Sequence, residues 1–212
     1  MKITLSKAGK KYGSEWIFRN ASFEIGAGEQ AAILGTNGSG KSTLLQIMSG
    51  DVFLTEGSVE YHTGGLPVRP EYIFRHLSIA APYMELPEEL SLRELLLFHA
   101  RFKPFLYGIT LHDVIKTSGL EQSAEKQIKN FSSGMKQRVK LALAILSGGS
   151  LVLLDEPASN LDAAGIDWLR SLIKTYCRTR TLIICSNHQP AEYDLCSRVL
   201  EMKDLKLPVK QG

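Results

Sequence analysis

The sequence predicts an α/β fold with a mostly parallel sheet flanked by helices, an N-terminal antiparallel β subdomain and an inserted helical subdomain. Short apolar runs at residues 31–34, 151–154 and 181–186 are typical of parallel strands that are buried on both faces. Amphipathic stretches at helical spacing separate these runs. The chain has 212 residues, which fits one such domain, 1–212, better than two independent domains.

The first part of the chain, residues 1–30, alternates weakly between apolar and polar side chains. The alternation is visible around residues 3–5 and again around 23–25, and the turn-prone Gly9 and Gly13 lie between them. We therefore expect antiparallel strands in this region.

Two further strands and a helical region are expected in the middle of the chain. Residues 57–61 and 77–81 flank a Gly/Pro-rich loop, and we expect both segments to return to the antiparallel sheet. Helical spacing then extends over about residues 84–148. Within it, Ser91 begins a capping-box pattern and Thr110 is placed to cap a second helix. This range predicts the inserted helical subdomain.

The segment GTNGSGKST follows the first apolar run and opens a helical pattern that Gly50 is placed to end. A strand, a glycine loop and a helix in this order can bind a polyphosphate, because backbone N–H groups and the positive end of the helix point at the anion. Lys41 supplies a point charge for the β- and γ-phosphates, and the Ser42 hydroxyl can ligate Mg²⁺. The candidate nucleotide-binding residues are Gly35, Thr36, Asn37, Gly38, Ser39, Gly40, Lys41, Ser42 and Thr43. The fold is thus predicted to be that of a P-loop NTPase. Kinases, GTPases and transport ATPases all share such a loop.

A pair of carboxylates follows the strand at 151–154. Asp155 and Glu156 emerge at its carboxyl end, where α/β sheets bind their ligands. Asp155 suits Mg²⁺, directly or through water, and Glu156 is placed to orient and polarise an attacking water. A crossover helix is expected over 166–176, before the next buried strand.

The segment FSSGM, residues 131–135, can form a second phosphate-binding cradle. Ser132 offers a hydroxyl, Gly134 a flexible backbone, and a helix is expected to start just after Gly134. Taken alone, this segment also suits an ordinary helix cap. The same holds for Ser159–Asp162, a turn with a helix cap, and for His188, a histidine at a strand end.

In their order along the chain, GTNGSGKST, FSSGMKQR, LVLLDEP, SNLD and SNH resemble the motifs of the ATP-binding cassette family, specifically the nucleotide-binding subunit of a transporter. The likeness covers nearly the whole chain. It implies that Glu156 is the catalytic base, that His188 senses the γ-phosphate and that Tyr12 stacks on adenine. It also implies that two cassettes dimerise head to tail and share each ATP. The residues that would cover the ATP of the other cassette are Ser132, Ser133, Gly134 and Met135.

The sequence departs from the family pattern in two places. Ser133 and Met135 replace a glycine and a glutamine of the usual LSGGQ signature, while Ser132 and Gly134 remain. No glutamine follows the strand at 77–81, where the family usually carries one, and Tyr83 is the nearest residue by spacing. In the family, this glutamine contacts Mg²⁺ or water and takes part in the coupling to a permease. This sequence therefore lacks a direct counterpart to both contacts.

Charge and hydropathy limit the partners. The net charge is +3 with acids and bases interspersed, so no nucleic-acid partner is expected. The apolar runs are too short to cross a bilayer, and the N-terminus lacks the apolar region of a signal peptide. Cys177, Cys185 and Cys196 show no metal spacing and are expected to be reduced. We expect a cytoplasmic protein, peripheral on the inner face of the cell membrane.

The resemblance implies an ATP hydrolase that uses ATP and Mg²⁺, forms a homodimer and powers a transmembrane permease. The helical segment at 84–148 would form the groove that receives the permease. Two alternatives are a cassette ATPase acting on nucleic acid or ribosomes, and a P-loop kinase. The first usually carries tandem cassettes, coiled coils or basic insertions, and the second needs an acceptor-binding lid and leaves the FSSGM and SNLD segments unexplained.

Overall fold

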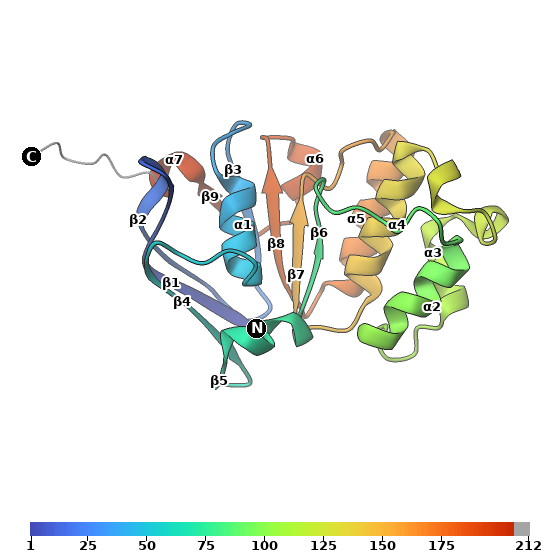
Figure 1. Cartoon of the computed structure of the whole chain (residues 1–212), viewed down its shortest axis with the longest axis horizontal. Helices are drawn as coiled ribbons and strands as arrows, with labels where there is room; N and C mark the ends of the chain where they lie inside the picture. Colours follow the sequence, from blue (N-terminus) through green and yellow to red (C-terminus); the bar gives the residue numbers. More distant parts are fainter. Residues whose placement is uncertain (206–212) are drawn as a thin grey trace, which may run out of the picture.

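The computed structural model describes residues 1–205 and contains two sheets. The antiparallel sheet has the order β2-β1-β4-β5, and the parallel sheet has the order β6-β7-β8-β3-β9. Figure 1 shows the antiparallel sheet at one side of the molecule, the parallel sheet in the centre, and helices α2 to α4 at the other side. The predicted α/β fold, with a mostly parallel sheet and an N-terminal antiparallel sheet, is confirmed.

The strands have the following bounds. The antiparallel sheet contains β1 (Lys2–Tyr12), β2 (Glu15–Ile25), β4 (Glu56–Thr63) and β5 (Leu66–Val68). The parallel sheet contains β3 (Gln30–Leu34), β6 (Leu77–Ala80), β7 (Leu151–Asp155), β8 (Thr181–Ser186) and β9 (Arg198–Glu201).

The helices connect these strands. The α-helices are α1 (Lys41–Ser49), α2 (Leu92–Phe102), α3 (Leu111–Ser118), α4 (Ser133–Leu146), α5 (Ala163–Tyr176), α6 (Pro190–Tyr193) and α7 (Met202–Leu205). Three 3₁₀ turns are η1 (Pro70–Arg75), η2 (Glu121–Ser123) and η3 (Ile128–Asn130). Helices α2, α3 and α4 fall within 84–148, and the boundaries of a helical subdomain stay a prediction.

Two expectations about the strands are wrong. The segment at 77–81 does not return to the antiparallel sheet, because β6 pairs in parallel with β7, with Leu77 opposite Leu151. Most of its side chains are buried, so it has no solvated face and suits the interior sheet.

Gly9 is not at a turn but inside β1, at a shift of register. A Cβ there would lie 2.7 Å from Glu56 Cγ, which explains the need for glycine.

The helix starts follow from local capping. Ser91 forms the predicted capping box with Glu94. Thr110 is the predicted N-cap, and it also forms a capping box with Asp113. Helix α4 begins at Ser133, earlier than expected, because the Ser132 hydroxyl accepts a hydrogen bond from the backbone N–H three residues later, at 3.2 Å. The whole FSSGM segment therefore surrounds a helix N-terminus.

The parallel sheet is covered on both faces. Alternate residues of β7 enter different cores: Val152 and Leu154 pack with the helices α2 to α5, and Leu151 and Leu153 pack with α1 and the antiparallel sheet. This two-sided burial fixes the sheet, and with it the loops that follow the carboxyl ends of β3, β7 and β8. Within residues 1–205, every helix is too short or too polar to cross a lipid bilayer.

Candidate active site

The glycine loop after β3 leads directly into α1. Gly38 and Gly40 adopt positive φ angles of 76° and 102°, a region that glycine enters at little cost. A Cβ at Gly40 would lie 2.4 Å from Ile17 Cγ2, so a side chain does not fit there. The Ser39 hydroxyl is buried and lacks a hydrogen-bond partner among residues 1–205. A narrow backbone loop with an unused hydroxyl suits a phosphate chain.

The side chain of Lys41 lies within this loop. It is only 4 % exposed, and its Nζ donates hydrogen bonds to the carbonyl oxygens of Gly35 at 2.7 Å and Thr36 at 3.1 Å. The same nitrogen lies 3.9 Å from Glu156 Oε1. The loop therefore holds one buried positive charge next to the carboxylate that follows β7.

Asp155 is the last residue of β7 and is 2 % exposed. Burial raises the pKa of its carboxyl group, while the nearby Ser42 hydroxyl acts in the opposite direction. Its Oδ1 atom is buried and has no hydrogen-bond partner in the described part of the chain. An orphaned carboxylate oxygen beside a hydroxyl is a combination that Mg²⁺ accepts.

The residues present fit Mg²⁺ rather than a metal held by protein ligands alone. Among residues 1–205 there is no cluster of three or more His, Cys, Asp or Glu side chains that could hold a metal ion. Mg²⁺ commonly takes one or two protein ligands and completes its shell with phosphate oxygens and waters. Ser42 and Asp155 are the side chains that would hold it.

Replacing Asp155 with asparagine tests this assignment. We expect the Mg²⁺ concentration for half-maximal ATP hydrolysis to rise by about tenfold or more, because one charged oxygen ligand is lost. Since burial disfavours the charged form of Asp155, the unfolding temperature without metal should stay the same or rise. Titration of the ATPase rate with Mg²⁺ and a thermal melt measure both effects. An unchanged Mg²⁺ requirement would contradict the assignment.

The structure gathers the loop and the acid pair around one pocket of about 410 Å³. Its lining comprises Ile17, Asn37, Gly38, Ser39, Gly40, Lys41, Ser42, Thr43, Pro82, Tyr83, Asp155 and Glu156. On the other side of the loop, His188 and the residues Gly35 to Ser39 line a second pocket. The Nε2 atom of His188 lies 3.8 Å from Glu201 Oε2. Glu156 and His188, at the ends of adjacent strands, have positive φ angles of 45° and 52°. Such strain commonly occurs at functional sites.

Two groups of sequence-predicted residues lie outside this pocket. Tyr12 ends β1 with a ring that is 51 % exposed, and the ammonium group of Lys10 lies 4.8 Å from its centroid. Ser132 and Ser133 are exposed at the start of α4, while Gly134 and Met135 are half-buried. None of these residues lines the phosphate pocket of its own chain.

Sequence reasoning missed Ile17, which comes from β2 and lies against Gly40. It noted Tyr83 only by spacing, and the structure places Tyr83 in the pocket lining. Burial and the charge of Asp155 raise the pKa of the Tyr83 phenol to about 12, so the group stays a hydrogen-bond donor at neutral pH. Tyr83, the residue nearest by spacing to the family glutamine, therefore lines the pocket.

Glu192 is a further residue that sequence reasoning missed. Its carboxylate is 3 % exposed, accepts a hydrogen bond from the backbone N–H of Ala158 at 2.9 Å, and accepts another from the Ser186 hydroxyl. Ala158 follows Glu156 by two residues, and Ser186 precedes His188 by two. Glu192 thus connects the two loops that carry the predicted catalytic residues. A single acid on a four-residue helix gives no sequence signal for this role.

Comparisons with known proteins find related sequences. The sequence model of the family described as ABC transporter matches residues 18–159. The chain is 30% identical over 198 residues to the lantibiotic transport ATP-binding protein SrtF of Streptococcus pyogenes, covering 91% of this chain and 82% of that protein. It is 27% identical over 213 residues to the Nod factor export ATP-binding protein I of Burkholderia thailandensis, covering 95% and 68%.

A solved structure has a similar fold. It is the dimeric post-hydrolysis state of the ATP-binding cassette MJ0796 bound to ADP and Pi, with a TM-score of 0.79 and 22% sequence identity. The alignment covers 98% of this chain and 97% of that chain.

Proposed function

The chain belongs to the ABC transporter family, and from this membership we propose that it binds and hydrolyses ATP as the subunit that powers a separate membrane permease. The single observation that carries the proposal is the pocket in which Lys41, Asp155 and Glu156 meet. The relatives named above are ATP-binding proteins of transport and export systems, which supports the transport role over a nucleic-acid, ribosomal or kinase role.

Several residues in and beside the pocket have a chemical task in the proposed hydrolysis. The loop N–H groups and Lys41 would bind the phosphates. Ser42 and Asp155 would hold Mg²⁺, which would neutralise developing negative charge. Glu156 lies at the edge of the pocket and is partly exposed, so it can accept a hydrogen bond from a water placed in line with the terminal phosphate. His188, which lines a pocket with Gly35 to Ser39, would bind the γ-phosphate oxygens.

The geometry favours a site shared between two copies of the chain. The phosphate pocket is open to solvent. Ser132 and Ser133, in the second cradle, are exposed and do not line this pocket. A Cβ at Gly134 would lie 2.9 Å from the carbonyl oxygen of Asn160, so this cradle packs closely against the segment 159–162. In a two-fold dimer, the cradle of one copy would cover the nucleotide of the other. ATP binding would then close the dimer, and hydrolysis would release it.

Replacing Ser133 with aspartate tests this shared site. Ser133 is exposed in the first turn of α4, where a negative charge is favourable for the helix, so the fold should be retained. The new carboxylate would face the triphosphate of the partner copy, and like charges in an interface cost several kcal/mol, so we expect ATP hydrolysis to fall by about tenfold or more.

The matched control is His112→Asp, which adds an acid to the first turn of α3. It should leave the ATPase rate within about twofold, as expected of a surface change away from the site. Equal losses in both variants would show that added negative charge, rather than its place at the cradle, lowers the rate. The ATPase assay is performed at protein concentrations that permit dimerisation.

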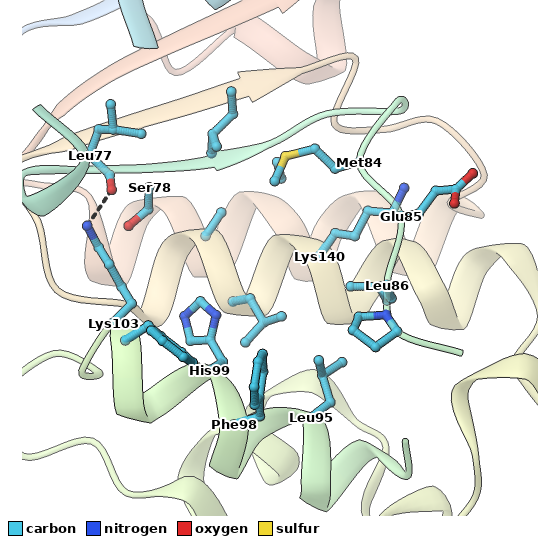
Figure 2. A pocket seen from close by; sticks show the side chains of 16 residues that line it. Leu77, Ser78, Met84, Glu85, Leu86, Leu95, Phe98, His99, Lys103 and Lys140 are labelled. Atoms are coloured by element: carbon cyan, nitrogen blue, oxygen red, sulfur yellow. Dashed lines mark hydrogen bonds between the residues drawn. The ribbon is translucent and has the colours of Figure 1, made fainter. Parts of the chain in front are cut away.

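A second groove lies between the parallel sheet and the helices α2 and α4. It has a volume of about 410 Å³ and is lined by β6, the segment 84–87, α2 and α4 (Figure 2). The segment 82–85 connects it to the phosphate pocket, because Pro82 and Tyr83 line that pocket while Met84 and Glu85 line the groove. We propose that this groove receives the permease, so that docking and the nucleotide site are joined by a few residues of chain.

The test is purification of this chain together with the membrane protein that its neighbouring gene encodes. We expect a complex that survives size-exclusion chromatography in detergent, and an ATPase rate that responds to the permease after reconstitution into lipid vesicles. This would place the chain at the inner face of the membrane. Absence of a complex, with binding to ribosomes or DNA instead, would contradict the proposal.

A further inference from the structure

The glycine loop begins between the ends of two other strands. In the parallel sheet β3 lies between β8 and β9, so that Leu34 is opposite Ser186 on one side and opposite Glu201 on the other. His188 follows β8 by two residues, and Glu201 is the last residue of β9. Because parallel strands bring their carboxyl ends to the same edge, both residues lie beside the start of the loop.

The side chains of His188 and Glu201 meet across this start. His188 Nε2 lies 3.8 Å from Glu201 Oε2, and both residues line the pocket that Gly35 to Ser39 help to form. The distance is too long for a direct hydrogen bond, but it is within the range of an ion pair when the ring is protonated. Among the described residues, the lining of this pocket adds one more charged side chain, the exposed Lys203.

This position of His188 differs from the one that the proposed hydrolysis requires. Within residues 1–205, the lining of the phosphate pocket includes Lys41, Asp155 and Glu156 but not His188. The imidazole is 44 % exposed, so little packing opposes a change of its rotamer. One ring nitrogen donates one hydrogen bond, so Nε2 can serve either the Glu201 carboxylate or a phosphate oxygen. To bind the γ-phosphate through Nε2, His188 would have to leave Glu201.

We propose that Glu201 is a positioning residue, which holds His188 beside the loop until the γ-phosphate draws the ring into the phosphate pocket. The proposal rests on the function proposed above and adds a residue that acts through His188. Since the carboxylate competes with the γ-phosphate for one imidazole, Glu201 lowers the affinity for ATP. ADP has no γ-phosphate, so its affinity does not depend on this competition.

The first arm of the test replaces Glu201 with glutamine and measures equilibrium binding with Mg²⁺ present. The amide has the same shape, and the side chain is partly exposed, so the fold should be retained. We expect the dissociation constant of a non-hydrolysable ATP analogue to fall by about two- to fivefold, the usual effect of a partly exposed ion pair, while that of ADP stays the same. The control, Lys203→Gln, removes the other charge of this pocket and should tighten neither nucleotide.

The second arm repeats the measurement in a His188→Ala background. If Glu201 acts through His188, Glu201→Gln has no further effect on the binding of the ATP analogue in this background. Loss of simple repulsion between the Glu201 carboxylate and the phosphates would instead tighten the ATP analogue and ADP alike, with or without the histidine. Thermal melts of the single and double variants report whether each is folded.

Three outcomes would overturn the positioning role of Glu201. They are an unchanged affinity of Glu201→Gln for the ATP analogue, an equal gain for ADP, and a gain that persists in the His188→Ala background. If the wild-type chain neither binds nor hydrolyses ATP, the proposed function fails, and this proposal fails with it. If it does both while Glu201→Gln gives any of the three outcomes, only the role of Glu201 is wrong.

Discussion

Replacing Glu156 with glutamine is expected to slow ATP turnover by about 10²- to 10⁴-fold while ATP still binds, the usual effect of losing a general base. The amide has the same shape but cannot accept a proton from the attacking water. Binding should persist, because Lys41 keeps its hydrogen bonds to Gly35 and Thr36, and the loop amides do not involve Glu156. The steady-state rate of phosphate release and the equilibrium binding of a fluorescent ATP analogue measure the two effects.

The control is Glu60→Gln, an exposed acid on β4. It should leave both measurements within about twofold, as expected of a surface substitution. A Glu156→Gln enzyme with the wild-type rate would show that this carboxylate does not activate water. A loss of ATP binding instead of turnover would show that Glu156 acts mainly through its contact with Lys41, at 3.9 Å.

Replacing Lys41 with alanine should weaken nucleotide binding itself, by about 10²- to 10³-fold, since loss of one partner from a buried charge pair costs several kcal/mol. The ammonium group is buried and held by the loop, so its charge is already in place before the phosphates arrive. Isothermal titration with ATP and Mg²⁺ gives the dissociation constant.

The control for this variant is Lys129→Ala. Lys129 is half-exposed and lies 3.9 Å from Glu89 on the surface, where a lost ion pair has little effect. A melt of both variants reports whether the Lys41→Ala loop is still folded. Full ATP affinity in folded Lys41→Ala protein would contradict the placement of the phosphates in this loop.

Local sequence signals predicted those parts of the fold that local chemistry determines. The glycine loop, the Gly50 end of α1 and the capping residues Ser91 and Thr110 all act within a few residues of chain. The continuous apolar run before Asp155 likewise reports burial on both faces of one strand. Such features need no knowledge of what packs against them.

Long-range packing explains what the sequence did not reveal. The sheet that β6 joins depends on its pairing with β7, about 70 residues later in the chain. Ile17 meets Gly40 only because β2 crosses the glycine loop, and Glu192 reaches Ala158 only after α6 packs on the sheet. The place of Tyr12 relative to a nucleotide stays a prediction, since its ring lies outside the pocket lining.

A mixing experiment tests most directly whether two copies share each ATP. Lys41→Ala protein retains an intact cradle, and Ser133→Asp protein retains an intact phosphate loop, so each variant alone should be nearly inactive. In an equal mixture, random pairing makes about half of the dimers mixed, each with one complete site, and up to about a quarter of the wild-type ATPase rate should return. If the mixture shows only the sum of the two separate rates, each chain holds its nucleotide alone and the shared site is wrong.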